Sequence, residues 1–147
     1  MADPSVTLFG PIDSLLGPYV EYVVLALVVV NLVTRKIAHD AHVRQARDGG
    51  ADAISYHPVH WAVTGLLVLA TFYYTTLHRH AGVVLSLFVV GMFVADVFEF
   101  EARLVEARND MEIESPKGSL LISVLAFLYA AYVSLFFLVE PLWNKIV

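Results

Sequence analysis

One segment, residues 81–110, constrains the fold of this chain more than any other; it reads AGVVLSLFVVGMFVADVFEFEARLVEARND. Its first part, 81–98, is apolar except for Ser86 and Asp96. A helix of about 20 apolar residues crosses a hydrocarbon layer of roughly 30 Å. Its second part is rich in Glu, Asp and Arg, and neither Gly nor Pro interrupts the junction. The segment therefore predicts one helix that begins in a membrane and continues into water.

The overall composition agrees with a membrane protein. Of the 147 residues, 59% are hydrophobic and 16% are charged, and the mean hydropathy is +0.71. An average soluble domain has roughly 45–50% apolar residues. The net charge of −5 and the absence of Cys argue against nucleic-acid binding and against thiolate metal sites. No Lys or Arg precedes the first apolar residues, which argues against a cleaved signal peptide.

Apolar segments elsewhere predict three more helices. Residues 1–18 contain several Pro and Gly, so they predict either a surface segment or a short, half-buried helix around 12–16. Helical composition also continues past the first and third spans, over about 35–48 and 99–110. The predicted fold is all-α: one membrane domain over 1–147, an integral membrane four-helix bundle whose first and third spans extend as cytoplasmic helices. The predicted spans are about 19–34, 60–77, 81–98 and 118–142.

Helix-terminating residues set the predicted ends of these elements. Gly49 and Gly50 end the first helix, because glycine accepts the left-handed conformation of a C-terminal cap. Pro58 suits the first turn of the second span. Ser115 and Pro116 form a plausible cap and first turn for the last helix, and Pro141 closes it.

The distribution of Lys and Arg predicts the orientation. The side opposite both termini holds seven of these residues, and the other side holds only Arg79 and Lys145. Basic loops remain in the cytoplasm. We therefore expect a multi-pass protein of the cell membrane, with loops 35–57 and 99–117 cytoplasmic and both termini outside. The seven residues are Arg35, Lys36, Arg44, Arg47, Arg103, Arg108 and Lys117.

Two polar side chains in the predicted spans, Asn31 and Asp96, need a partner within the membrane. The Asn31 amide needs a partner on another helix. Asp96 is costly in lipid when charged, by about 2.5–3.5 kcal/mol on insertion scales. We expect it to pair with Arg35 or Lys36, which reach a similar depth. An ion relay through Asp96 would need a second carboxylate or His at mid-membrane, and the sequence offers none.

Four histidines lie on one predicted side of the membrane. His39 and His42, like His57 and His60, are three residues apart, so each pair shares a face if the segment is helical. Two imidazoles on one face can share a metal ion. The alternative is that these side chains are solvated or hydrogen-bonded near the lipid headgroups.

The two cytoplasmic extensions differ in charge. The first is mainly basic and the third mainly acidic, so they can dock on each other or on the cytoplasmic face of another protein. Glu99 and Arg103 also have the spacing of a favourable i,i+4 pair. The candidate interaction residues are Arg35, Lys36, Arg44, Arg47, Glu99, Glu101, Arg103, Glu106, Arg108 and Asp110.

Small residues predict where helices approach closely in the membrane. Gly65 and Gly91 are candidates. Ala126, Ala130 and Ser134 recur every four residues and form one stripe on the last helix. This stripe is either a seam within the chain or a contact with a partner subunit.

Several segments resemble a family of small haloarchaeal integral membrane proteins that is known only as a domain of unknown function. They are GPYVEYVVLALVVVNLVTRKIAHDAHV, DGGADAISYHPVH, ADVFEFEARLVEARND, SPKGSL and YAAYVSLFF, which together cover most of the chain. The resemblance implies four spans and a haloarchaeal host, consistent with the acidic excess. It transfers no catalytic residue.

These observations lead to a functional hypothesis. We expect a non-catalytic accessory or scaffold subunit of a larger respiratory or transport complex, with lipid and other membrane subunits or further copies of itself as partners and no cofactor. One alternative is a metal-binding or redox membrane protein that uses the four histidines. A third is a homo-oligomer that transports ions through Asp96.

Overall fold

The computed structural model describes residues 9–147, and every regular element in that part of the chain is helical. The predicted all-α class is confirmed. Residues 1–8 of the predicted N-terminal surface segment lie outside the described residues. In chain order the elements are α1 (Pro11–Leu16), η1 (Gly17–Tyr19), α2 (Val20–Gly49), η2 (Ala51–Ala53), α3 (Pro58–Leu77), α4 (Arg79–Arg108) and α5 (Lys117–Ile146).

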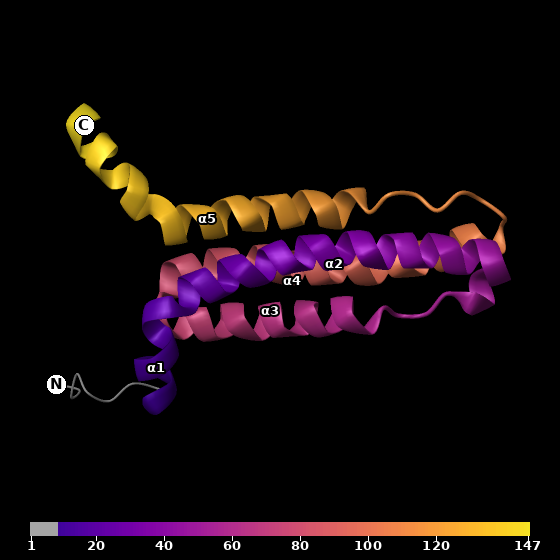
Figure 1. The fold of residues 1–147 in the computed structure, drawn as a ribbon, viewed down its shortest axis with the longest axis horizontal. Coiled ribbons are helices and arrows are strands. Elements are labelled where there is room, and N and C mark those ends of the chain that lie inside the picture. Colours follow the sequence, from indigo (N-terminus) through magenta and orange to yellow (C-terminus); the bar gives the residue numbers. More distant parts are fainter. Residues whose placement is uncertain (1–8) are drawn as a thin grey trace.

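The four long helices lie side by side and alternate in direction (Figure 1). Helices α2 and α4 each contact both α3 and α5. Three helical stretches are long and apolar enough to cross a membrane: Pro11–Gly49, α4 and α5. Helix α3 has 20 residues but is less apolar, because it carries several Thr, Tyr and His. Its polar residues His60, Thr64, Thr71 and Tyr74 are buried and therefore face the other helices.

The predicted helix end at Gly49 and Gly50 and the predicted helix start at Pro58 are confirmed. Helix α2 runs without a break from the apolar segment to Gly49, and Gly50 adopts a φ of 70°. Pro58 lies in the first turn of α3. Helix α4 is one continuous rod of 30 residues that joins the apolar and charged parts of its sequence. The predicted short helix near the N-terminus exists as α1, but its apolar side chains Ile12 and Leu15 are exposed.

Helix α5 differs from the prediction at both ends. It begins at Lys117, and no side chain at its N-cap accepts a hydrogen bond, so the predicted Ser115 cap is wrong. Glu99 of α4 instead accepts a hydrogen bond from the Ser119 backbone N–H, at 2.9 Å. Pro141 does not end the helix, which continues to Ile146. A proline inside a helix removes one hydrogen bond and bends the axis, and the C-terminal part of α5 swings away from the other helices (Figure 1).

The buried residues recur every three or four positions on each long helix, and they change in character along the molecule. Near the N-terminal end of α2 the core is apolar. Toward the C-terminal end of α2 it becomes polar. The apolar part consists of Val20, Val24, Val28, Leu67, Tyr74, Leu85, Val89, Met92, Ala126 and Ala130. The polar part includes Asn31, Thr34, Arg35, His42, His60, Thr64, Asp96, Arg103, Ser119 and Ser123.

The small-residue stripe of α5 faces the inside of the chain. Ala126, Ala130 and Ser134 are fully or almost fully buried, and Ser119 and Ser123 continue the same stripe toward the start of the helix. Helix α5 packs against α2 and α4. Of the two interpretations drawn from the sequence, the structure therefore supports a seam within the chain.

Close helix approach depends on a different glycine from those the sequence suggested. The prediction for Gly65 and Gly91 is wrong, because a Cβ on Gly65 would meet no atom within 4 Å and one on Gly91 would make only an ordinary contact. At Gly82, beside the α3–α4 turn, a Cβ would lie 2.3 Å from the Thr75 Cα. The backbones of α3 and α4 therefore touch at Gly82.

We predict that Gly82→Ala destabilises the protein by about 1–3 kcal/mol, because the added methyl group overlaps the Thr75 backbone. Gly65→Ala is the matched control. It adds the same group to open space within a helix, where Ala is more favourable than Gly by about 0.5–1 kcal/mol. Denaturant unfolding in detergent micelles measures both. Equal stability of the two variants would contradict the close approach at Gly82.

Candidate functional site

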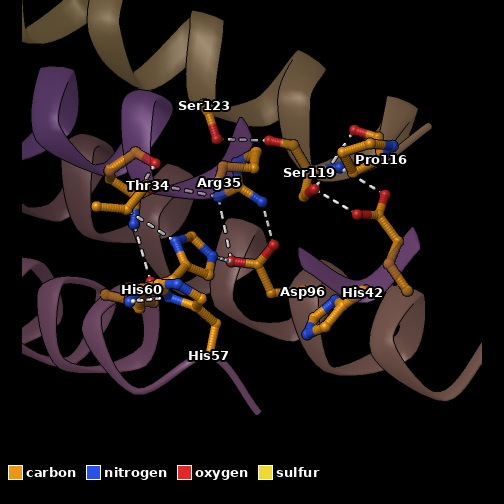
Figure 2. Close-up of polar contacts among 12 residues, drawn as sticks. Thr34, Arg35, His42, His57, His60, Asp96, Pro116, Ser119 and Ser123 are labelled. Atoms are coloured by element: carbon orange, nitrogen blue, oxygen red, sulfur yellow. Dashed lines mark hydrogen bonds and ion pairs between the residues drawn. The ribbon is translucent and has the colours of Figure 1, made fainter. Parts of the chain in front are cut away.

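The polar part of the core is organised around one ion pair between α2 and α4. The Arg35 guanidinium donates hydrogen bonds to both carboxylate oxygens of Asp96 (Figure 2). The two side chains are only 3% and 8% exposed. The expected pairing of Asp96 with a basic residue of the first helix is confirmed, and Arg35 rather than Lys36 provides it. Lys36 is exposed and pairs with Asp40 at 2.8 Å.

Asn31 connects this ion pair to α3. Its side-chain oxygen accepts a hydrogen bond from Arg35 at 2.9 Å, and its amide nitrogen donates to the Thr64 hydroxyl at 2.8 Å. Thr64 in turn donates to the backbone carbonyl of His60. The predicted need of Asn31 for a partner on another helix is confirmed, and both ends of its amide are satisfied.

His60 approaches the same carboxylate from α3. Its Nε2 lies 3.4 Å from Asp96 Oδ2, and its Nδ1 lies 3.0 Å from the Thr34 hydroxyl (Figure 2). If Nε2 carries the proton, the ring donates a hydrogen bond to the Asp96 carboxylate; an unprotonated Nε2 would place a lone pair against it. Asp96 belongs to α4, and it contacts α2 through Arg35 and α3 through His60. The carboxylate therefore joins three helices.

A second group of contacts lies further along α2 and α4, within the predicted extensions. His42 Nε2 lies 2.9 Å from the Ser55 carbonyl oxygen, and its Nδ1 lies 3.1 Å from an Arg103 guanidinium nitrogen. The Phe100 ring packs edge-on against the His42 ring, with centroids 5.4 Å apart. Burial and the neighbouring Arg103 charge lower the pKa of His42 to about 4. A neutral His42 can donate to Ser55 and accept from Arg103 at once, and a protonated one cannot.

Helix α5 joins the polar core through Glu99. Its carboxylate accepts hydrogen bonds from the backbone N–H and the hydroxyl of Ser119. The Ser123 hydroxyl donates to the Ser119 carbonyl oxygen at 2.6 Å (Figure 2). The predicted i,i+4 pairing of Glu99 with Arg103 does not form, because Glu99 is engaged by α5 and Arg103 by His42.

The ten candidate interaction residues separate into two groups. Arg35 and Arg103 are buried in the polar core, and Glu99 and Glu106 are partly buried. Between residues 9 and 147, no ion pair joins the two extensions, and His42 on the first contacts Phe100 and Arg103 on the other. The other six side chains are exposed: Lys36, Arg44, Arg47, Glu101, Arg108 and Asp110.

The four candidate metal ligands do not gather at one point. His42 and His60 are buried in different parts of the polar core, while His57 lies in the N-cap of α3, where its ring accepts from the His60 N–H at 3.3 Å. His39 is partly buried on α2. No group of three or more His, Asp or Glu in the described part of the chain is arranged to hold a metal ion.

The polar core has little free space. A cavity of about 10 Å³ lies among Arg35, His42, His60, Asp96 and Arg103. This is about the volume that one water molecule needs. Arg35 Nε is a buried donor without a hydrogen-bond partner within the described residues, and it can bind such a water. A cavity of this size admits no organic substrate. The polar contacts around it hold the helices in place relative to one another.

Sequence reasoning missed the hydroxyl partners in this core. Thr34, Thr64 and Ser119 carry no signal in isolation, and only their three- or four-residue spacing from Asn31, His60 and Ser123 could have indicated them. It also missed two pairs at the other end of the molecule. There the Tyr73 hydroxyl donates to Asp13 at 2.7 Å and the Tyr74 hydroxyl donates to Glu21 at 3.0 Å.

We predict that Asp96→Asn destabilises the protein by about 3–5 kcal/mol, because it leaves the Arg35 charge buried without its counter-ion. Asp40→Asn removes a carboxylate of the same kind from the exposed pair with Lys36 and should leave stability nearly unchanged. Unfolding in detergent micelles measures both variants. If Asp96→Asn unfolded at the wild-type denaturant concentration, the central role of this ion pair would be refuted.

We also predict that stability falls as the pH decreases from about 6.5 to about 4. In this window the unfolded chain protonates His42, whose ordinary pKa is 6.5, whereas the folded chain does not. His42→Gln should therefore have a shallower pH dependence than the wild type. His80→Gln, which changes an exposed histidine at the opposite end, should retain the wild-type slope. The measurement is the unfolding free energy across this pH range.

Comparison with known proteins places the chain in a family. No curated protein and no solved structure matches it in these comparisons. The sequence profile of one family, described as a domain of unknown function (DUF7313), matches residues 3–147. This match covers almost the whole chain and includes every helix of the structure. The chain therefore belongs to the DUF7313 family, as its resemblance to an uncharacterised family predicts.

Proposed function

We propose that the protein is an integral membrane four-helix bundle in which α3 is the fourth span. The 20 residues of α3 are about 30 Å long, which matches a bilayer core. Its polar side chains His60, Thr64, Thr71 and Tyr74 are buried and face the other helices, so its lower hydropathy places few polar groups in lipid. The ends of α2 and α4 then project into the cytoplasm, with both termini outside, as the Lys and Arg distribution predicts. The acidic balance agrees with a haloarchaeal host.

Within that membrane architecture, we propose a non-catalytic accessory or scaffold subunit of a larger membrane complex. The observation that carries this proposal is a groove of about 460 Å³ at the cytoplasmic end. It lies between the last turns of α2 and the end of α4 with the loop that follows. Its lining combines charges of both signs with apolar side chains, including Arg47, Asp110, Met111, Glu112 and Ile113.

The distribution of charge supports the same proposal. The buried ionisable side chains Arg35, Asp96, His60, His42 and Arg103 hold the chain's own helices together. The charges around the groove, in contrast, are exposed. A protein segment with both acidic and basic side chains would complement them, and charged groups at the rim of an interface fix its register and partner choice.

We predict that purification under mild conditions from the source membrane yields companion polypeptides in a fixed ratio, identified by native mass spectrometry. The double variant Arg47→Glu, Asp110→Lys reverses two charges of the groove and should reduce the recovered companion at least about tenfold, as expected when rim charges become repulsive. Lys145→Glu reverses an exposed charge at the opposite end and should leave the companion in place. Purification of this polypeptide alone would refute the accessory role.

A further inference from the structure

The α3–α4 hairpin carries an apolar groove on its outer face that the proposed function does not use. The groove has a volume of about 400 Å³ and lies near the turn between the two helices. Its position differs from that of the polar core and of the cytoplasmic groove. It is lined by Phe72 and Thr75 of α3 and by Val83, Ser86, Leu87 and Val90 of α4.

The two polar side chains that line this groove have their hydroxyl groups engaged in hydrogen bonds. The hydroxyl groups of Thr75 and Ser86 lie 3.2 Å apart and hydrogen-bond to each other, and Thr75 also donates to the Thr71 carbonyl oxygen. The walls are exposed apolar side chains, with Leu87 69% and Phe72 49% exposed. The groove is therefore suited to a hydrocarbon chain rather than to a polar ligand.

An exposed cation, Arg79, lies at the end of the groove. His78 connects α3 to α4, Arg79 and His80 begin α4, and all three side chains are exposed. Of the acidic side chains at this end, Asp13 and Glu21 accept hydrogen bonds from Tyr73 and Tyr74, and Glu140 is exposed on α5. Arg79 has no ion-pair partner within 4 Å among residues 9–147.

The spacing of the turn and the groove fits one lipid molecule. Val83 and Val90 follow Arg79 by four and 11 residues, which places them about 6 and 16 Å along the helix from the turn. A phosphate at Arg79 would therefore have an acyl chain beside these residues. Cationic side chains at a membrane surface attract anionic headgroups.

We propose that the hairpin binds an anionic phospholipid, with its phosphate on the His78–His80 turn and one acyl chain in the groove of Phe72, Thr75, Val83, Ser86, Leu87 and Val90. This proposal rests on the membrane embedding of the proposed function but not on a partner subunit. Charge complementarity at the turn identifies the headgroup as anionic, and the apolar groove identifies the remainder as hydrocarbon.

The test uses delipidated full-length protein in detergent, titrated with phosphatidylglycerol or with phosphatidylcholine of the same chains. Native mass spectrometry measures the bound lipid. We expect the wild type to prefer phosphatidylglycerol about fivefold, the ratio that one cation near an anionic headgroup provides. Arg79→Gln should abolish this preference and leave phosphatidylcholine binding unchanged.

Two matched substitutions test the groove. Val83→Trp fills it and should weaken the binding of both lipids at least about threefold, since the acyl chain loses its contacts. Val30→Trp changes a valine of α2 with nearly the same exposed fraction, 44% against 45%, on a helix that does not line the groove. It should bind both lipids as the wild type does. Thermal unfolding confirms that each variant is folded before it is scored.

Three outcomes would overturn the proposal. They are equal binding of the two lipids by the wild type, an unchanged preference in Arg79→Gln, and wild-type lipid binding by Val83→Trp. A dimer that Val83→Trp dissociates without a change in lipid binding would identify a second copy as the occupant instead. Since the measurement needs only the isolated protein, failure to find a partner subunit would not affect it.

Discussion

The ion pair between Arg35 and Asp96 is the interaction on which the polar half of this structure depends. Removing two charges from water is costly, and their attraction compensates only when geometry and hydrogen bonding are nearly complete. Here Arg35 also donates to Asn31, and Asp96 also meets His60. Because these four residues come from α2, α3 and α4, the ion pair and its hydrogen bonds form together only when the three helices are in register.

In the membrane that we propose for this bundle, this constraint matters more than it would in water. Lipid is as apolar as a leucine side chain, so the hydrophobic effect does little to bring membrane helices together. Small residues and buried polar contacts then provide both attraction and register. The stripe of Ser and Ala on α5 and the contact of Glu99 with Ser119 attach the fourth helix in this way. Gly82 has the same role at the α3–α4 turn.

The molecule thus divides its charges between two tasks. Those at the base of the extensions of α2 and α4 are buried and hold the helices, and those at the tips are exposed. The small cavity in the polar core leaves no room for a substrate. Two of the surfaces that remain available for other molecules are the charged groove at the ends of α2 and α4 and the apolar groove of the α3–α4 hairpin. Both are places where this protein could contact a neighbour, and their chemistries differ, since one is charged and the other is a hydrocarbon site.

Much of the architecture could be predicted because it follows from local properties of the chain. Apolar length predicted the long helices, an uninterrupted junction predicted the rods α2 and α4, and Gly50 and Pro58 marked real helix boundaries. The need of Asp96 for a basic partner was also visible, because a buried carboxylate of this kind has few alternatives.

The site depended on tertiary packing. Opposite charges on the two extensions predicted that they attract each other, yet burial directs Arg103 to His42 and leaves Glu99 to α5. The glycine that permits close approach is Gly82, because only the geometry of the turn decides where two backbones meet. The sequence by itself determined which segments are helical, how long they are and which side chains cannot remain unpaired. Only the tertiary structure decided which partner each of them has, because helices pack through faces that the local sequence does not specify.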